Sequence, residues 1–235
     1  MLYFVDLQID NRKIYQDTED YGFSQDSVLL ASKAQISKSD KVLDLGTGVG
    51  ILCFLIAIKK GAQEIVGVDI QEESIKIANK SLELNQLENQ IKFINADVHD
   101  FEKYAKISYF DKVVCNPPYY NQALPKDANM RKAISSHEST ATLDDFIYAA
   151  TKALKNGGKL YMVHKMERLA DVMYSLKGHH LEPKKIVFIK PFINQPADTF
   201  IVEAKKGAQG GLKVEEIVCR NDDKSYTEEF LELYK

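Results

Sequence analysis

The sequence predicts an α/β fold in which a doubly wound, mostly parallel sheet of seven strands follows a short N-terminal extension. Two observations support this prediction. From residue 41 onward, short apolar runs typical of buried strands alternate with longer segments of helical periodicity. Several of these runs end in glycines, acids or an amide. Ligands of open α/β sheets bind at the carboxyl ends of the strands, so the same pattern predicts where a site lies.

Strands and helices alternate through the middle of the chain. The helix after the second strand is indicated by Ile75, Ala78 and Leu82, which recur at helical spacing. We expect strands at 41–45, 64–69, 91–95, 111–115, 159–164, about 185–189 and 199–204. We expect helices at 50–60, about 72–84, 142–155 and about 167–176.

The ends of one helix carry clear signals. Thr142, Asp144 and Asp145 suit a helix N-terminus, where they cap free N–H groups and complement the helix dipole. Asn156-Gly157-Gly158 then predicts the end of this helix. No helical pattern separates the last two predicted strands, so we expect the final strand to be antiparallel.

Residues 1–40 are expected to form an extension of the same domain rather than a domain of their own, with residues 41–235 forming the main body. The extension should contain a hairpin and then a helix from about Gln25 to Ala34, entered through Gly22-Phe23-Ser24. We expect the extension to act as a lid.

Composition narrows the class of protein. The chain has 235 residues, 45% hydrophobic and 28% charged, which fits one enzyme domain. Lys and Arg number 31 against 34 Asp and Glu, so the formal charge is −3; this argues against a large nucleic-acid footprint but allows a local basic patch. The N-terminus lacks a basic targeting segment, and the longest apolar stretch, 51–58, is too short for a membrane span, so we expect a cytoplasmic protein. Cys53, Cys115 and Cys219 show no metal or disulfide spacing, so we expect reduced thiols and no metal.

A glycine-rich loop, Asp44-Leu45-Gly46-Thr47-Gly48-Val49-Gly50, joins the first strand to the first helix. Its glycines let the backbone approach a nucleotide-like cofactor. The dinucleotide fingerprint places its third glycine three residues after the second, whereas here Gly50 comes two after Gly48. The spacing therefore favours a smaller adenosine-containing cofactor. Asp69 ends the second strand, where it can bind ribose hydroxyls, and Asp97 follows the third, where it can accept from an adenine amine.

The fourth strand ends in Asn116-Pro117-Pro118-Tyr119. Two prolines lack backbone N–H groups, so the chain must leave the sheet here. An amide, free carbonyls and an aromatic ring then stand at one strand end. These groups suit an exocyclic amine and the flat ring that carries it.

In this combination and order the chain resembles the class I S-adenosylmethionine-dependent methyltransferases, which have a Rossmann-like fold and modify exocyclic amines. The resemblance implies that Asn116, Pro117 and Tyr119 hold and align the target amine, as catalytic residues. It implies S-adenosyl-L-methionine as cofactor and S-adenosyl-L-homocysteine as product. The implied cofactor-binding residues are Phe23, Ser24, Asp26, Asp44, Gly46, Thr47, Gly48, Gly50, Asp69, Ile70, Asp97, Val98 and Asn116.

More of the chain resembles a bacterial group that methylates N6 of the adenine next to the anticodon of valine tRNA. This similarity covers Gly22 to Leu30, His164 to Leu169 and Tyr226 to Glu229 in addition to the core. It implies RNA, in particular tRNA, as partner. The expected substrate-binding residues are Pro118, Tyr120, Lys126, Arg131, Lys132, Lys165, Arg168 and Lys190, whose cations could form a phosphate-binding rim at the strand ends.

Other functions stay open at this point. The same Asn-Pro-Pro-Tyr loop also serves enzymes that methylate guanine N2 or a protein glutamine amide. From other classes, the chain could be a non-catalytic nucleotide-binding module or an NAD-dependent dehydrogenase. The glycine spacing disfavours the dehydrogenase, and the intact loop disfavours an inactive module.

Overall fold

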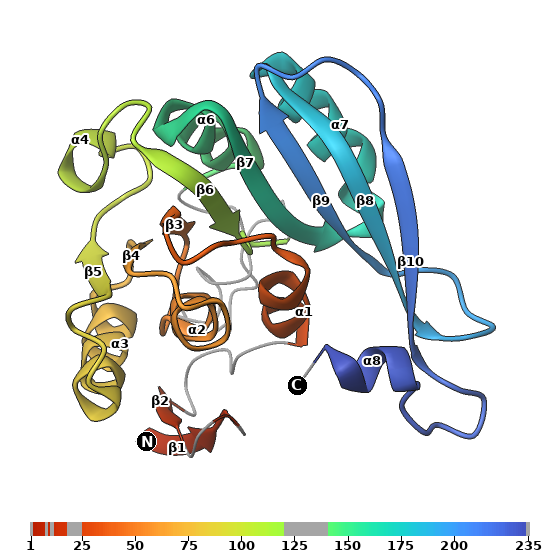
Figure 1. Cartoon of the computed structure of the whole chain (residues 1–235), viewed down its shortest axis with the longest axis horizontal. Helices are drawn as coiled ribbons and strands as arrows, with labels where there is room; N and C mark the ends of the chain where they lie inside the picture. The colour runs from red at the N-terminus through yellow and green to blue at the C-terminus, as the bar shows by residue number, and fades with distance from the viewer. Residues whose placement is uncertain (1, 8, 10–11, 18–24, 120–140, 234–235) are drawn as a thin grey trace, which may run out of the picture.

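An eight-stranded sheet forms the centre of the computed structural model, which describes residues 2–7, 9, 12–17, 25–119 and 141–233 (Figure 1). Its strands are β3 (Lys41–Leu45), β4 (Glu64–Asp69), β5 (Ile91–Asn95), β6 (Phe110–Cys115), β7 (Leu154–Lys165), β8 (Leu181–Phe192), β9 (Thr199–Lys206) and β10 (Lys213–Arg220). They lie in the order β10-β8-β9-β7-β6-β3-β4-β5. Only β9 runs antiparallel to both of its neighbours, which confirms the predicted antiparallel strand.

The prediction of seven strands was wrong by one, because β10 adds an eighth. This edge strand pairs in parallel with β8. Its first four residues, Lys213 to Glu216, are all exposed, and only Ile217 and Cys219 are buried. The exposed first half of this strand carries three charged residues. The strand therefore lacks the apolar run by which the other strands were found.

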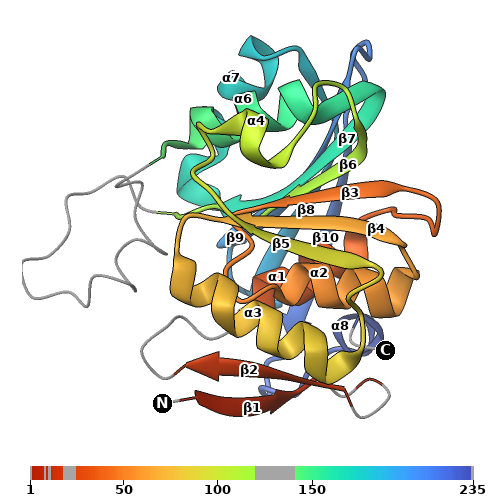
Figure 2. The same cartoon turned by 90° about the vertical axis from the view of Figure 1, so that its left-hand side faces the viewer.

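Helices cover both faces of the sheet, as Figure 2 shows. One face carries α1 (Gln25–Lys33), α2 (Ile51–Leu55) with its π-helical continuation Ile56–Lys60, α3 (Glu72–Asn85) and α8 (Glu228–Glu232). The other face carries α4 (Phe101–Tyr104), α6 (Leu143–Ala153) and α7 (Leu169–Gly178), the last preceded by a 3-10 turn over Met166–Arg168. Two separate clusters of buried apolar residues match these two layers, as a doubly wound fold requires.

The signals for the start of α6 are confirmed, whereas its end lies earlier than predicted. Thr142 Oγ1 accepts the N–H of Asp145, while Asp145 Oδ2 accepts the N–H of Thr142, forming a capping box. The helix ends at Ala153, and β7 begins at once with Leu154, five residues before the strand that the sequence predicts. The Asn-Gly-Gly segment therefore lies inside the strand, with Gly157 at φ +80°.

The N-terminal extension contains the predicted hairpin and helix. Strands β1 (Leu2–Asp6) and β2 (Lys13–Asp17) pair antiparallel. The hairpin lies against α3, where Ser81 Oγ accepts the N–H of Tyr15 and Asn85 donates to the carbonyl of Lys13 (Figure 2). Helix α1 joins the same apolar cluster as α2. The described part of the extension is thus packed into the main body.

The chain reverses its winding direction between β3 and β6, which lie side by side in the sheet. Leu45 in β3 pairs with Val68 in β4 and with Cys115 in β6, so these strands end at the same level. The residues that follow them meet at one edge of the sheet. Such a switch point is where open α/β sheets bind ligands.

Gly50, which precedes α2, is the tightest backbone position in this region. Its φ of +87° lies in the left-handed region, and a Cβ there would come within 2.5 Å of the Phe93 ring. Gly61 ends the same helical segment at φ +69°, but a Cβ there would meet no atom within 4 Å. Comparing substitutions at these two glycines therefore separates the cost of backbone strain from the cost of steric overlap.

We predict that Gly61→Ala lowers the melting temperature by about 2–8 °C, because left-handed φ costs about 1–2 kcal/mol. Gly50→Ala should lower it further, because overlap with Phe93 adds about 1–3 kcal/mol. Thermal unfolding followed by circular dichroism measures both. In a Phe93→Leu background the Gly50→Ala loss should fall toward the Gly61→Ala value, with a remainder from the Phe54 ring at 3.1 Å; an unchanged loss would contradict the overlap argument.

Candidate functional site

A pocket opens at the edge of the sheet where β3, β4, β5 and β6 end. Seven of the residues that the sequence predicts for cofactor binding line it: Gly46, Gly48, Asp69, Ile70, Asp97, Val98 and Asn116. Pro118, expected on the substrate side, lines it as well. The motifs found separately in the sequence therefore converge on one cavity.

Other predicted cofactor residues lie behind or beside this pocket. Asp44, Thr47 and Gly50 support the glycine loop from below rather than line the cavity, and Asp26 contacts the loop after β6 instead. Phe23, Ser24, Tyr120, Lys126, Arg131 and Lys132 lie outside the described residues.

Sequence reasoning missed several lining residues. They are Leu45, Val68, Gln71, Ala96, Ala141 and Phe146. Phe146 lies on α6, and a Cβ added at Gly46 would come within 3.3 Å of its ring. Nothing in the sequence distinguishes Phe146 from the other apolar residues of that helix. Gln71 comes two residues after Asp69. The argument from strand ends would have found it if it had included the two residues that follow each strand.

Asp44 is fully buried at the end of β3. Its Oδ2 accepts a hydrogen bond of 2.6 Å from Thr47 Oγ1, and its Oδ1 has no hydrogen-bond partner among the described residues. Burial raises the pKa of Asp44 to about 7, although the hydrogen bond from Thr47 opposes this rise. Near neutral pH this carboxyl is therefore divided between its protonated and ionised forms.

Asp69 links the end of β4 to the glycine loop. Its Oδ2 accepts the N–H of Gly48 at 2.8 Å, and its Oδ1 accepts the N–H of Gln71 at 2.9 Å. Each carboxylate oxygen has a second lone pair, so both can also accept from ligand hydroxyls. A Cβ added at Gly48 would meet nothing within 4 Å, which leaves the backbone of the loop open to a ligand.

Asp97, after β5, is held by His99. One carboxylate oxygen, Oδ1, accepts the backbone N–H of His99 at 2.9 Å and lies 2.6 Å from His99 Nδ1. The other ring nitrogen of His99 is 3.4 Å from Asp145 at the start of α6. The hydrogen bond with Asp97 raises the pKa of His99, and the charges of both acids add to this rise. His99 therefore fixes the carboxylate that faces the pocket.

The Asn-Pro-Pro-Tyr loop leaves β6 directly above the pocket. Asn116 Nδ2 donates to Ser27 Oγ at 3.1 Å, and Asn116 Oδ1 lies 2.6 Å from the Tyr119 hydroxyl. The same hydroxyl lies 2.8 Å from Asp26 Oδ2. Side chains of α1 thus hold a loop whose two prolines cannot donate backbone hydrogen bonds.

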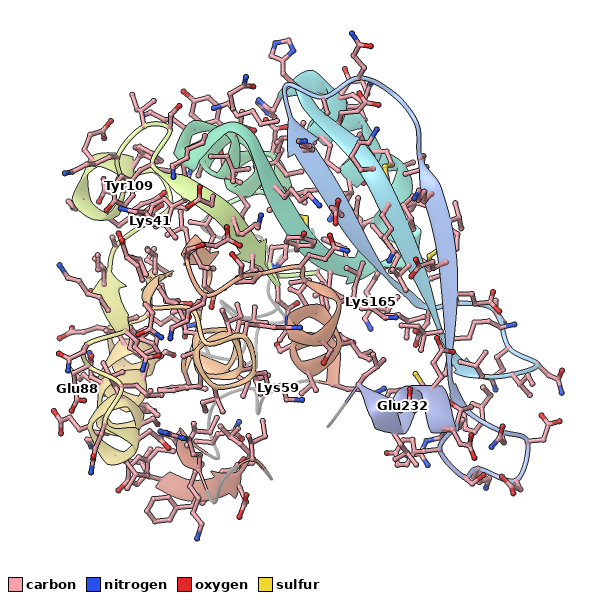
Figure 3. The ribbon with its side chains drawn as sticks, in the orientation of Figure 1. Lys41, Lys59, Glu88, Tyr109, Lys165 and Glu232 are labelled. Carbon is pink, nitrogen blue, oxygen red and sulfur yellow. The ribbon has the colours of Figure 1, made fainter. Side chains whose placement is uncertain are left out.

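The predicted cationic rim is only partly brought together. Lys165 lies between α1 and the strands β8 to β10 (Figure 3), with Nζ 3.8 Å from Asp26 and 2.9 Å from Thr199 Oγ1. Arg168 pairs with Asp171 at 2.7 Å and Lys190 with Glu216 at 3.5 Å. Of the described cations, Lys165 is therefore the one next to the Asn-Pro-Pro-Tyr loop.

Other binding features are sparse in the described parts of the chain. The three cysteines are buried and free, as predicted. Among the residues described, no group of three or more His, Cys, Asp or Glu could hold a metal ion. No helix in those segments combines the length and apolar character that a membrane crossing requires.

The raised pKa of Asp44 predicts a pH dependence of stability. Its folded pKa, about 7, exceeds its ordinary value of 3.8, so the folded state holds a proton that the unfolded chain releases. The stabilisation is complete below about pH 4 and is lost as the pH rises to about 7. Asp44→Asn should flatten the free energy of unfolding over this window, as measured by urea denaturation. Identical slopes for both proteins between pH 4 and 7 would contradict the assignment.

Solved structures share this fold. A predicted O-methyltransferase, Atu636 of Agrobacterium tumefaciens, superposes with a TM-score of 0.72 at 22% identity, covering 89% of this chain and 95% of that one. Pyrococcus horikoshii TYW2, solved in complex with MeSAdo, gives a TM-score of 0.62 at 14% identity, covering 87% and 70%. At these identities the likeness concerns the fold.

Curated relatives match nearly the whole chain. A tRNA1(Val) (adenine(37)-N6)-methyltransferase of Shewanella sp. (strain MR-4) is 24% identical over 213 residues, 90% of this chain and 89% of its own length. The protein of that name from Vibrio vulnificus (strain YJ016) is 26% identical over 215 residues, 89% and 85%. The family model described as "Methyltransferase small domain" matches residues 20–178. The chain therefore belongs to the methyltransferase small domain family.

Proposed function

We propose that this protein is an S-adenosylmethionine-dependent methyltransferase that methylates N6 of an adenine in tRNA, next to the anticodon. The observation that carries the proposal is the position of Asn116. Its amide lines the same pocket as the carboxylates of Asp69 and Asp97, so an acceptor group and a cofactor site share one cavity.

The residues present fit the cofactor. Asp69 and Asp97 offer carboxylate oxygens at neighbouring strand ends, which suit ribose hydroxyls and an adenine amine. The open face of Gly48 suits a ligand that lies against the backbone. The complex of Pyrococcus horikoshii TYW2 with MeSAdo supports an adenosine ligand on this fold. When bound, S-adenosylmethionine supplies a methyl group that its sulfonium centre already activates.

The remaining task of the chain is to orient the target nitrogen. We propose that Asn116 Oδ1 and the Pro117 carbonyl accept hydrogen bonds from the exocyclic amine, which turns its lone pair toward the methyl group. Tyr119 would stack on the base, an interaction worth about 1–3 kcal/mol. Correct alignment alone can supply up to about 7–11 kcal/mol of barrier reduction in favourable cases.

No histidine is assigned as a general base. His164 is fully buried, and its Nδ1 accepts the N–H of Lys165 at 2.9 Å. Burial, together with the charges of Arg168 and Lys165, lowers the pKa of His164 to about 4. The lone pair of the neutral ring is thus committed to the backbone. The amine can lose its proton to solvent after methyl transfer.

The choice of tRNA rests on the relatives and on charge. The Shewanella and Vibrio proteins are named as tRNA1(Val) (adenine(37)-N6)-methyltransferases and match over most of this chain. We call the Asn-Pro-Pro-Tyr loop, residues 116–119, the acceptor loop. Lys165 supplies a cation beside it that can approach a phosphate. We propose that Lys126, Arg131, Lys132, Arg168 and Lys190 extend this contact when RNA docks.

The test is to incubate the protein with labelled S-adenosylmethionine and, separately, unmodified tRNA, DNA and a release-factor protein. Mass spectrometry then identifies the methylated residue. N6-methyladenosine in tRNA alone is the expected result. Methylated guanine or glutamine would show that the acceptor is not adenine, although the protein would still be a methyltransferase.

We predict that Asn116→Ala abolishes turnover while S-adenosylhomocysteine binding stays near that of wild type. The reason is that the Asn116 amide is proposed to align the target amine, whereas Asp69 and Asp97 are proposed to hold the cofactor. Isothermal titration calorimetry and a single-turnover methylation assay measure the two quantities. If turnover survives, Asn116 has no part in aligning the amine.

Asp69→Asn is predicted to weaken S-adenosylhomocysteine binding about ten- to one-hundredfold, because hydrogen bonds to a charged group contribute about 1.5–3 kcal/mol. Calorimetry measures the dissociation constant. Asp100→Asn is the matched control, since Asp100 follows the lining residue Asp97 by three positions but is not itself a lining residue, and pairs with Lys103 at 2.5 Å on the surface. Equal affinities for both variants would refute the role of Asp69.

A further inference from the structure

The first turn of α1 contacts the acceptor loop rather than the cofactor pocket. Asp26 Oδ2 lies 2.8 Å from the Tyr119 hydroxyl, and Ser27 Oγ lies 3.1 Å from Asn116 Nδ2. Tyr119 and Asn116 contact each other at 2.6 Å, which closes the network. Asp26 and Tyr119 are 93 residues apart in the chain, so this is a contact between the extension and the main body.

This network decides which end of the Asn116 amide faces Tyr119. The Nδ2 group is a donor and binds Ser27 Oγ, which places Oδ1 on the side of Tyr119. Only the oxygen can accept from a target amine. A reversed amide would present donors to that amine and repel it, so the orientation matters for the proposed chemistry.

The Tyr119 hydroxyl has one hydrogen and two acceptors within reach, Asp26 Oδ2 and Asn116 Oδ1. The contact with Asn116 Oδ1 is the shorter, at 2.6 Å against 2.8 Å for Asp26 Oδ2, so the two acceptors share this hydrogen, and the carboxylate contributes a charge-assisted bond. Burial raises the pKa of Tyr119 well above its ordinary value, and the charge of Asp26 raises it further, so the phenol stays protonated. Asp26 and Asn116 therefore hold the hydroxyl from two sides, and the bond to Asp26 ties the ring to α1.

Lys165 completes the arrangement. Its ammonium lies 3.8 Å from Asp26 Oδ2 and 5.3 Å from the centre of the Tyr119 ring. The His164 ring lies 5.3 Å from the same ring on the β7 side. The Tyr119 ring, which is proposed to stack on the target base, is thus held by hydrogen bonds at its hydroxyl and by Lys165 and His164 beside the ring.

We infer that Asp26 is a positioning residue for the acceptor, acting through the Tyr119 hydroxyl on the ring of Tyr119 and on the amide of Asn116. This inference rests on the proposed function. It differs from the role that the sequence predicts for Asp26, which was to cover the cofactor. If Asp26 covers the cofactor, its loss weakens cofactor binding; if it positions the acceptor, its loss slows turnover.

The kinetic test compares Asp26→Ala, Asp26→Asn and Tyr119→Phe with Gln25→Ala as control. Gln25 lies in the same turn of α1 but donates to Cys219 Sγ, away from the acceptor loop. We expect Asp26→Ala and Tyr119→Phe each to lower kcat about ten- to one-hundredfold, with S-adenosylhomocysteine affinity within about twofold of wild type. Asp26→Asn should recover part of the loss, because its amide oxygen can still accept from Tyr119.

The double variant Asp26→Ala/Tyr119→Phe shows whether the two residues act together. If Asp26 works through the hydroxyl, the double variant is no slower than the slower single variant. Losses that multiply would overturn the inference. A weakened cofactor affinity with unchanged kcat in Asp26→Ala would overturn it as well and would restore the role of cofactor cover.

A second measurement does not depend on activity. Protein labelled with 3-fluorotyrosine gives ¹⁹F resonances, and the one missing in Tyr119→Phe identifies Tyr119. This resonance should shift in Asp26→Ala and stay in place in Gln25→Ala; an unmoved resonance in Asp26→Ala refutes the contact. If wild-type protein methylates no acceptor, the proposed function fails, whereas this spectrum still decides whether Asp26 holds Tyr119.

Discussion

The parallel pairing of β3 with β4 on one side and with β6 on the other determines what the pocket contains. Because Leu45 is level with both Val68 and Cys115, the next residues of all three strands emerge together. The winding direction changes at this point, so α2, which follows β3, and α6, which follows β6 in the described chain, lie on opposite faces of the sheet. A shift of one strand by one residue would turn Asp69 or Asn116 away from the others.

Asp69 and Asp44, two acids at this edge, have opposite surroundings. Asp69 has backbone N–H partners on both oxygens, which stabilise its charge and leave it able to bind a ligand. Asp44 is fully buried, which raises its pKa, and its side-chain donors are the Thr47 hydroxyl and the weaker Cys53 thiol; the charge of Asp69 adds to the rise. The structure therefore surrounds one carboxylate at the pocket with N–H donors and disfavours a charge on the second. A cation bound nearby would favour ionisation of Asp44.

The sequence could predict the parts of the site that local chemistry marks. Glycines in a tight loop, acids at strand ends and prolines after a buried strand are recognisable without a structure, and these residues do meet in one pocket. Strand β10 escaped notice because an edge strand with one exposed half carries charges where a central strand carries apolar residues. Phe146 and the partners of Asp26 depend on which distant elements pack together, and no short-range pattern contains that information.

The acceptor loop illustrates why long-range contacts matter most at such a site. Two prolines free the loop from the sheet, but they also remove the backbone donors that would otherwise fix it. Side chains must supply that order, and in this protein they come from α1, in the segment that precedes the sheet in the chain. The geometry proposed to align an amine thus depends on the packing of the extension against the main body. Loosening of α1 would therefore impair the acceptor side before it affects the carboxylates of the pocket, which are held by bonds within the sheet edge itself.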